Sequence, residues 1–215
     1  MIDLYCERLA TGFWAEPLNA LTNLSFLVAA FFAWRLAVSR QLLSAGTWTL
    51  ITLIASIGIG SFLFHTFATG WAMAADLIPI LLFQAAFLWI YAARSIGWNV
   101  PMRLGSAALL IAGFALGSRY PEVLNGSLRY APAIMLLLGL GAYHWMRAES
   151  ERGILLLAAG VLCLSLLFRS IDLSLCYAFP TGSHFLWHLL NGLVLYLVFR
   201  GLAAARLPGP KTAAA

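Results

Sequence analysis

Charged residues are scarce in this chain: they make up 10% of its 215 residues, whereas a soluble globular domain carries about 25%. Hydrophobic residues make up 62%, and the mean hydropathy is +0.89 over the whole length. One soluble core cannot hold so much apolar sequence. These values therefore exclude a soluble protein and predict many membrane-spanning helices with almost no domain outside the membrane.

Two further features that the sequence lacks reduce the number of possible function classes. The net charge is +5, but the chain has no basic run interleaved with aromatic residues, which argues against nucleic-acid binding. It also has no internal repeat of the kind that many transporters carry. No feature of the sequence requires an obligate protein partner.

Stretches long enough to cross a bilayer, whose hydrocarbon core needs roughly 20 apolar residues, occur seven times. Pro17 and Pro132 suit helix starts. We predict an all-α, polytopic bundle of seven transmembrane helices in a single domain, residues 1–207, with a disordered tail, residues 208–215. The expected spans are Leu18–Val38, Thr47–His65, Ala72–Ala92, Met102–Ser118, Tyr130–Met146, Gly153–Phe168 and His184–Phe199.

The distribution of positive charge predicts the orientation. Cytoplasmic loops carry an excess of Lys and Arg, so the side with more of them is expected to be cytoplasmic. Nine lie on the side that holds the C-terminus and four on the other, which predicts a cytoplasmic C-terminus and an N-terminus outside. The nine are Arg35, Arg40, Arg94, Arg103, Arg147, Arg152, Arg200, Arg206 and Lys211, and the four are Arg8, Arg119, Arg129 and Arg169.

Three histidines interrupt these apolar spans, and ionisable residues inside a bilayer mark a functional site by default. His65 ends the second span, and His184 and His188 open the seventh. The expected topology puts all three in the outer leaflet at similar depth. His184 and His188 are four residues apart and share one helix face. Three imidazoles suit a catalytic zinc that keeps one position open for water.

Two more polar residues fall at the same depth. Ser61 precedes His65 by four residues, and Asp76 lies about one turn into the third span. Asp76 could take a proton from water and pass it to a leaving amine. Ser61 could donate a hydrogen bond to a developing oxyanion. The pattern predicts a zinc hydrolase with Asp76 and Ser61 as catalytic residues.

Three alternative roles for the histidines remain compatible with the sequence. A membrane histidine often forms a hydrogen bond between helices. Paired histidines can also bind haem, although haem ligands usually come from opposing helices and an i, i+4 pair suits one metal ion. A transporter or proton channel needs polar residues along its whole path, and the inner halves of these helices are nearly all apolar. His144, near the inner end of the fifth span, is interpreted as structural.

Three motifs together resemble the alkaline ceramidase family, which belongs to a wider group of seven-helix membrane hydrolases that includes adiponectin receptors. The resemblance covers nearly the whole chain in order and topology. The motifs are Asp3-Leu-Tyr-Cys-Glu-Arg8 with Phe13-Trp-Ala-Glu-Pro-Leu-Asn19 and Thr22-Asn23, then Gly60-Ser-Phe-Leu-Phe-His65 with Asp76, then His184-Phe-Leu-Trp-His188.

The resemblance implies an intramembrane zinc amidase that splits ceramide, or a similar N-acyl lipid taken from the membrane, into a fatty acid and a long-chain base. His65, His184 and His188 match the zinc ligands, Asp76 the general acid/base and Ser61 the oxyanion-stabilising serine. The short, arginine-rich chain resembles a bacterial member, expected in the inner membrane with its active site toward the periplasm. The alternative within the group is a receptor-like or sensory protein with little hydrolytic activity.

The resemblance also implies calcium as a second metal, with Asp3, Glu7 and Glu16 as candidate ligands, since carboxylate oxygens suit calcium. The chain departs from the family pattern here, because Arg8-Leu9 stands where an asparagine ligand is expected. The alternative is that Glu7 and Arg8 are surface charges and that Glu16 caps the first helix.

The cysteines give a further expectation. Cys6 and Cys176 both fall on the outer side, which is compatible with a disulfide between the N-terminal segment and the loop before the seventh span. Members of the resembled family can carry such a bridge. Cys163 lies in mid-membrane and is expected to be free and to pack as an apolar residue.

Four more residues are expected to support the site. Asn19 and Asn23 are expected to hydrogen-bond across helices. Trp187 and Asn191 are candidates for contacts behind the zinc histidines. For Trp187 the alternative is a place in the interfacial aromatic belt.

Overall fold

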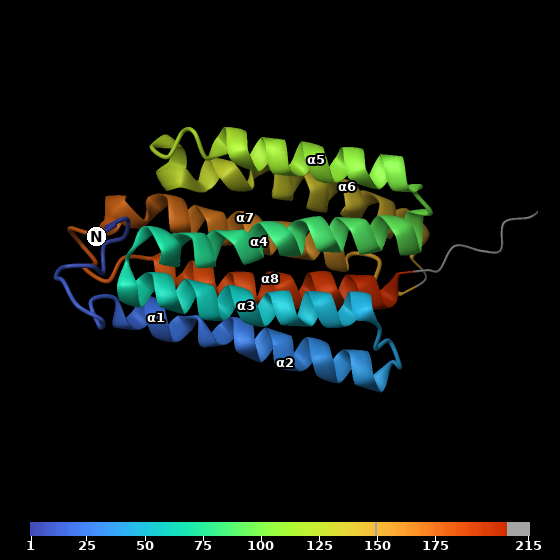
Figure 1. Cartoon of the computed structure of the whole chain (residues 1–215), viewed down its shortest axis with the longest axis horizontal. Helices are drawn as coiled ribbons and strands as arrows, with labels where there is room; N and C mark the ends of the chain where they lie inside the picture. Colours follow the sequence, from blue (N-terminus) through green and yellow to red (C-terminus); the bar gives the residue numbers. More distant parts are fainter. Residues whose placement is uncertain (149, 206–215) are drawn as a thin grey trace, which may run out of the picture.

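The computed structural model describes residues 1–148 and 150–205, and all regular structure in these residues is helical. The helices lie side by side along the long axis of the molecule (Figure 1). They are α1 (Pro17–Thr22), α2 (Leu24–Ser39), α3 (Ala45–Phe67), α4 (Gly70–Tyr91), the π-helical turn η1 (Ala92–Ile96), α5 (Val100–Gly117), the 3₁₀ segment η2 (Val123–Tyr130), α6 (Ala131–Arg147), α7 (Ile154–Leu175) and α8 (His184–Ala204).

The prediction of an all-α bundle with seven spans is confirmed, because seven helical segments are long and apolar enough to cross a membrane. The first span is interrupted at Asn23, between α1 and α2, and the third continues past α4 through η1. Helix α7 reaches Leu175, although the sequence predicted an end at Phe168. The expected disordered tail, residues 208–215, lies outside the described residues.

Helix ends follow the local sequence. Pro17 and Pro132 lie in the first turns of α1 and α6, where a missing N–H costs nothing. Ser44 and Thr47 form a reciprocal capping box at the start of α3. Only Ala68 and Thr69 separate α3 from α4, and Ala68 makes this tight turn with a left-handed conformation (φ 48°). The end of α3 therefore lies directly beside the start of α4.

Helices α3 and α8 are the most buried spans. Helix α8 packs against α1, α2 and α7, while α3 packs against α1, α2 and α4. Small residues make these contacts close: a Cβ added at Gly192 of α8 would lie 2.9 Å from Ser25 of α2. The residues on α3 and α8 are thus the best shielded from the surroundings.

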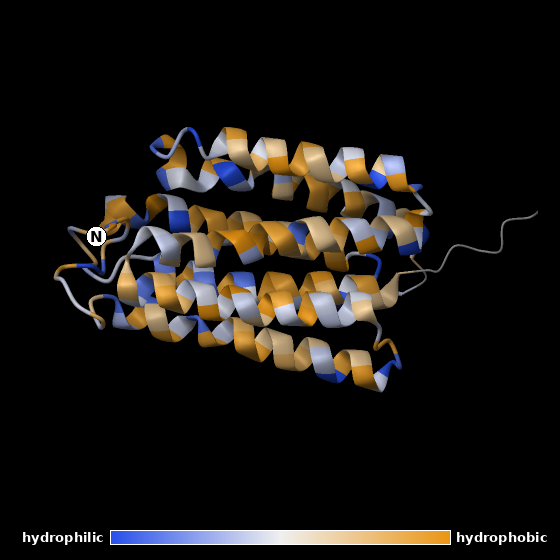
Figure 2. Cartoon of the chain, viewed as in Figure 1, coloured by the Kyte–Doolittle hydropathy of each residue, from blue (hydrophilic) through white to orange (hydrophobic). Residues whose placement is uncertain are grey.

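The outer surface is suited to lipid. Hydrophobic residues cover the lengths of the helices, and hydrophilic residues lie mainly toward the two ends of the bundle (Figure 2). Leu109 and Met135 are 76% and 74% exposed although both are large and apolar. Side chains of this kind are stable on an outer surface when hydrocarbon surrounds it.

Candidate metal centre

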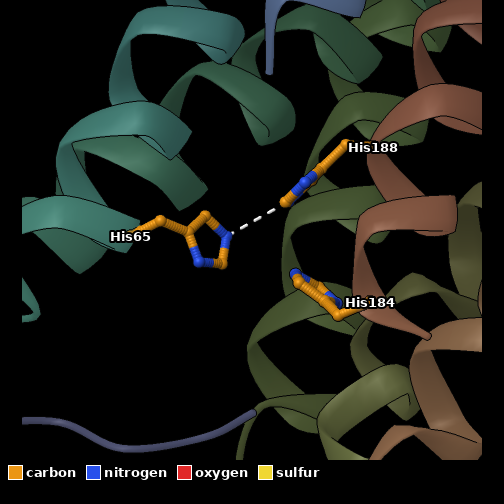
Figure 3. Close-up of side chains that lie close together, drawn as sticks. All are labelled: His65, His184 and His188. Atoms are coloured by element: carbon orange, nitrogen blue, oxygen red, sulfur yellow. Dashed lines mark hydrogen bonds between the residues drawn. The ribbon is translucent and has the colours of Figure 1, made fainter. Parts of the chain in front are cut away.

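The three histidines converge inside the bundle, close to the end that holds the N-terminus. His65 comes from the last turns of α3, and His184 and His188 come from the first two turns of α8. Each side chain offers a ligand atom within 4.8 Å of the other two, and all three residues are at most 2% exposed. Figure 3 shows His65 facing His188 across the gap between the helices, with His184 beside them. This is the only such group of His, Cys, Asp or Glu in the described residues.

The hydrogen bonds of two rings leave their Nε2 atoms free to bind a metal. The Nδ1 atom of His65 lies 2.5 Å from Oε2 of Glu16, and a carboxylate accepts only, so Nδ1 carries the proton. The Nδ1 atom of His188 lies 2.9 Å from the Thr22 hydroxyl. That hydroxyl donates to the carbonyl of Leu18 at 2.8 Å, so it accepts from His188. Both Nε2 atoms then carry lone pairs.

These two Nε2 atoms lie 3.1 Å apart. The lone pairs of the two Nε2 atoms repel each other at this distance, and a cation bound between them would remove this repulsion. Tetrahedral zinc with Zn–N bonds of 2.0–2.1 Å separates its ligand nitrogens by about 3.3 Å. The buried Nδ1 atom of His184 has no hydrogen-bond partner among the described residues. The donor set and its spacing fit a zinc ion.

His184 is held by one contact to its ring and one to its main chain. Tyr5 stacks on it with ring centroids 3.6 Å apart and an interplanar angle of 14°. Asp172, which is fully buried, accepts the backbone N–H of His184 at 2.9 Å and that of Ser183 at 2.6 Å. It also accepts the N–H of Cys6 at 3.0 Å. Asp172 therefore ties the start of α8 to α7 and to the N-terminal segment.

The predicted catalytic residues Ser61 and Asp76 line a cavity whose walls include none of the three histidines. Ser61 is buried one turn before His65, and Asp76 is partly buried in the second turn of α4. The cavity continues along α4 to Phe87, which is about 16 Å deeper at 1.5 Å per residue. Its walls are mostly apolar: Phe26, Ile57, Ile80, Phe83, Gln84, Phe87, Tyr130, Ala133, Leu136, Leu137, Leu162, Trp187, Asn191, Val194, Leu195 and Val198, with Ser61 and Asp76 at one end.

The candidate calcium ligands are not gathered around a common point. Asp3 is exposed. Glu7 accepts the backbone N–H groups of Leu18 at 2.6 Å and Asn19 at 2.8 Å, so it caps α1. The interpretation of Glu7 as a surface charge is wrong, because it is 8% exposed. Burial raises the pKa of Glu7, and the two N–H groups oppose this rise.

Glu16 stands at the N-cap position of α1, yet its side chain makes no capping hydrogen bond. It contacts His65 and forms a buried ion pair with Arg8, so Arg8 is not a surface charge either. Burial alone would raise the pKa of the Glu16 carboxyl. The hydrogen bond from His65 and the charge of Arg8 outweigh burial, so the pKa lies below its usual value.

The hydrogen bonds across helices predicted for Asn19 and Asn23 are wrong, and so is the contact with a histidine predicted for Asn191, but Asn19 does support the site through Glu16. Asn23 donates to the carbonyl of Asn19 at 2.8 Å within the same span, and Asn19 donates to Glu16 at 3.1 Å. These bonds brace the first span and Glu16, and they do not cross between helices. Asn191 donates to Ser165 of α7 at 2.9 Å and to the carbonyl of Trp187, with no bond to a histidine.

Trp187 belongs to a group of aromatic residues around the buried guanidinium of Arg169. Trp187 is 6% exposed, so it does not lie in an interfacial belt. The guanidinium of Arg169 lies 5.6–5.9 Å from the ring centroids of Tyr5, Tyr130 and Trp187. Arg169 also donates a hydrogen bond to Ser127 at 3.0 Å. This bond joins η2 to the end of α7.

Two of the three cysteines are paired, and the fourth histidine lies away from the triad. Cys6 and Cys176 form a disulfide that joins the N-terminal segment to the end of α7. Cys163 is free, as predicted, but it is exposed, so its expected role as a packing residue is wrong. His144 is buried on α6 and contacts the hydroxyl of Tyr91 at 2.9 Å, as a structural histidine would.

Several residues around the site were missed from the sequence. Asp172 and Arg169 are ionisable residues within a spanning helix, which is the signal that singled out His65 and Asp76. The sequence places Arg169 only among the outer loop cations and gives Asp172 no role, because the sixth span is expected to end at Phe168. Tyr5 and Thr22 carry no such signal, since their roles depend on how the N-terminal segment folds over the bundle.

Comparisons with known proteins give one family. A family model described as Ceramidase matches residues 3–212, which is nearly the whole chain. The comparison with curated proteins finds no match.

Proposed function

Because the chain belongs to the ceramidase family, we propose that it is a zinc-dependent amidase of the membrane that hydrolyses the N-acyl bond of ceramide or a similar lipid. The products are a fatty acid and a long-chain base. The convergence of three buried histidines beside a cavity that contains Ser61 and Asp76 carries this proposal. Family membership supports a hydrolase of amide bonds, and the apolar cavity supports a lipid chain as part of the substrate.

The side chains divide the chemistry among them. His65, His184 and His188 would hold the zinc, which when bound would supply Lewis acidity to the amide carbonyl and lower the pKa of a water molecule. Asp76 accepts the proton of the attacking water and delivers it to the leaving amine nitrogen. Ser61 donates a hydrogen bond to the carbonyl oxygen as negative charge develops there. The apolar walls from Ile80 to Phe87 hold an aliphatic chain and exclude bulk water.

We also propose that the N-terminus is outside and the C-terminus cytoplasmic, which puts the site toward the periplasmic side of a bacterial inner membrane. The sequence predicts that nine of the 13 Lys and Arg residues lie on the side that holds the C-terminus. The disulfide at the opposite end supports an oxidising compartment there. A C-terminal fluorescent protein that folds only in the cytoplasm tests this topology, and a dark fusion on an expressed chain contradicts it.

The proposal is tested by metal content and turnover of the purified protein. Elemental mass spectrometry is expected to find about one zinc per chain in the wild type, and mass spectrometry of lipids is expected to find released fatty acid from ceramide. His188→Ala is expected to lose zinc and turnover. His144→Ala is the matched control, because His144 lies outside the triad, and it is expected to keep both.

The outcomes separate the candidate functions. Full activity of His188→Ala contradicts the ligand assignment. A wild type that holds zinc but turns over no N-acyl lipid favours the receptor-like alternative. A wild type without zinc, purified without chelator, contradicts the metal centre itself.

A further inference from the structure

The N-terminal segment inserts a buried cation beside the histidine triad. Arg8 Nε donates to Oε1 of Glu16 at 2.5 Å, and the two side chains are 1% and 2% exposed. No other acid residue among the described residues lies within ion-pairing distance of Arg8. A charge this deeply buried is stable only when it is paired and hydrogen-bonded, so Arg8 and Glu16 depend on each other.

This ion pair contacts His65 at two places. The second oxygen of Glu16, Oε2, accepts the Nδ1 proton of His65 at 2.5 Å, and Asn19 donates to the same oxygen at 3.1 Å. The NH2 group of Arg8 donates to the backbone carbonyl of His65 at 2.8 Å. The ring of His65 is thus held by Glu16 and its main chain by Arg8. Carboxylates that orient a ligand histidine in this way also raise its basicity.

The same contacts leave no site for the calcium ion that the family resemblance implies. Calcium takes six to eight oxygen ligands. Both oxygens of Glu7 accept the N–H groups at the start of α1, and both oxygens of Glu16 face donors. Asp3 is exposed and does not join them. The acidic residues therefore do not fit calcium, and the guanidinium of Arg8 already neutralises Glu16.

We propose that Arg8 is a positioning residue whose guanidinium serves as a built-in cation, holding Glu16 against His65 so that the metal centre needs no calcium. The fork of Arg8 spans the carboxylate and the carbonyl at once, which a point charge such as lysine cannot reproduce. The inference rests on the proposed zinc assignment and is independent of the lipid substrate.

The test is the zinc affinity of the purified protein, measured by competition with a chromogenic chelator. Arg8→Gln is expected to bind zinc on the order of 10–100-fold more weakly, as when the partner of a ligand histidine is lost. Arg8→Lys is expected to fall between Arg8→Gln and the wild type, because it keeps the charge but not the fork. Arg40→Gln is the matched control: it removes a guanidinium from the ion pair with Glu151, far from the triad, and is expected to keep wild-type affinity.

Calcium provides a second measurement that needs no variant. Zinc affinity and thermal stability of the wild type are expected to be the same in millimolar calcium and in calcium-free buffer without a chelator. A rise of either with calcium, or calorimetric binding of calcium to the zinc-loaded wild type at millimolar or lower concentration, overturns the proposal. If Arg8→Gln binds zinc as tightly as the wild type does, the proposal is also overturned. A wild type without zinc instead contradicts the proposed function, so the two failures are distinguishable.

Discussion

Asp76 is the only acidic residue among those that line the cavity. It does not belong to the group of side chains that can hold a metal. A carboxylate beside a hydrolytic metal, yet outside the ligand set, is suited to proton transfer, because it is free to accept a proton without giving up the metal. Because different residues carry the two proposed roles, a single substitution can remove proton transfer and leave metal binding intact.

Asp76→Asn is the substitution that separates them. Asparagine has nearly the same shape but cannot act as a base at neutral pH. We expect the variant to keep about one zinc per chain and to lose on the order of 100- to 10,000-fold in turnover. Elemental analysis and mass spectrometry of released fatty acid on the same sample measure both quantities. Turnover close to that of the wild type would assign the proton transfer to another group.

The sequence predicted the meeting of the histidines but not the contacts that orient them. His184 and His188 share a helix face by spacing alone, and the alternation of spans brings the end of α3 to the same level. By contrast, Glu16 reaches His65 through an irregular segment whose path depends on Arg8 and on the disulfide at Cys6. Irregular segments have no periodicity from which such long-range partners can be read.

At the scale of helices, the contact between α3 and α4 determines how Ser61 and Asp76 lie relative to each other. Pro79 has no N–H to donate to the carbonyl of Ala75, four residues earlier in α4. Gly60 of α3 lies against that carbonyl, and a Cβ built on Gly60 would be 1.9 Å from its oxygen. Only glycine allows this approach, and it occurs next to both proposed catalytic residues.

Gly60→Ala is expected to push α3 and α4 apart. The added methyl group overlaps backbone that cannot move without shifting a helix, which costs about 1–3 kcal/mol or more. Thermal unfolding in detergent is expected at a lower temperature than for the wild type, with reduced turnover. Gly160→Ala is the control, because nothing lies within 4 Å of its added Cβ and alanine is the better helix former. Equal melting temperatures for the two variants would contradict the close contact.

At the scale of the whole molecule, each end of the bundle is closed by different chemistry. The end with the metal centre is tied by the disulfide and by Asp172, both of which join segments distant in sequence. At the opposite end, Glu151 bridges Arg40, just after α2, and Arg200 of α8, with distances of 3.0 and 2.7 Å. The first closure combines a covalent bond with the hydrogen bonds of a buried carboxylate, whereas the second is ionic, partly exposed and therefore sensitive to pH and salt.

The titration of Glu151 gives the sign of that sensitivity. Partial burial would raise its pKa, but the hydrogen bonds and charges of Arg200 and Arg40 outweigh burial and lower it below the usual value. A carboxyl whose pKa is lower in the folded state stabilises the fold above its unfolded pKa, and this contribution is lost as the pH falls through the folded value. The bridge is thus expected to stabilise the bundle at neutral pH and to be lost in acid, below the usual glutamate pKa and through the lowered folded value.

Glu151→Gln tests this directly. At neutral pH and low salt the variant is expected to be less stable than the wild type by about 0.5–1 kcal/mol, as for partly exposed ion pairs. The difference should shrink as the pH falls below the usual glutamate pKa and in high salt, because the wild type then loses the same bridge. Glu122→Gln is the control, since Glu122 is exposed and forms no ion pair among the described residues. Melting curves of both variants and the wild type between pH 3.5 and 7 measure the effect. A loss of stability in Glu151→Gln that does not change with pH would contradict the prediction. It would mean that glutamine disturbs the left-handed backbone at this position (φ 52°) and that the charge contributes nothing.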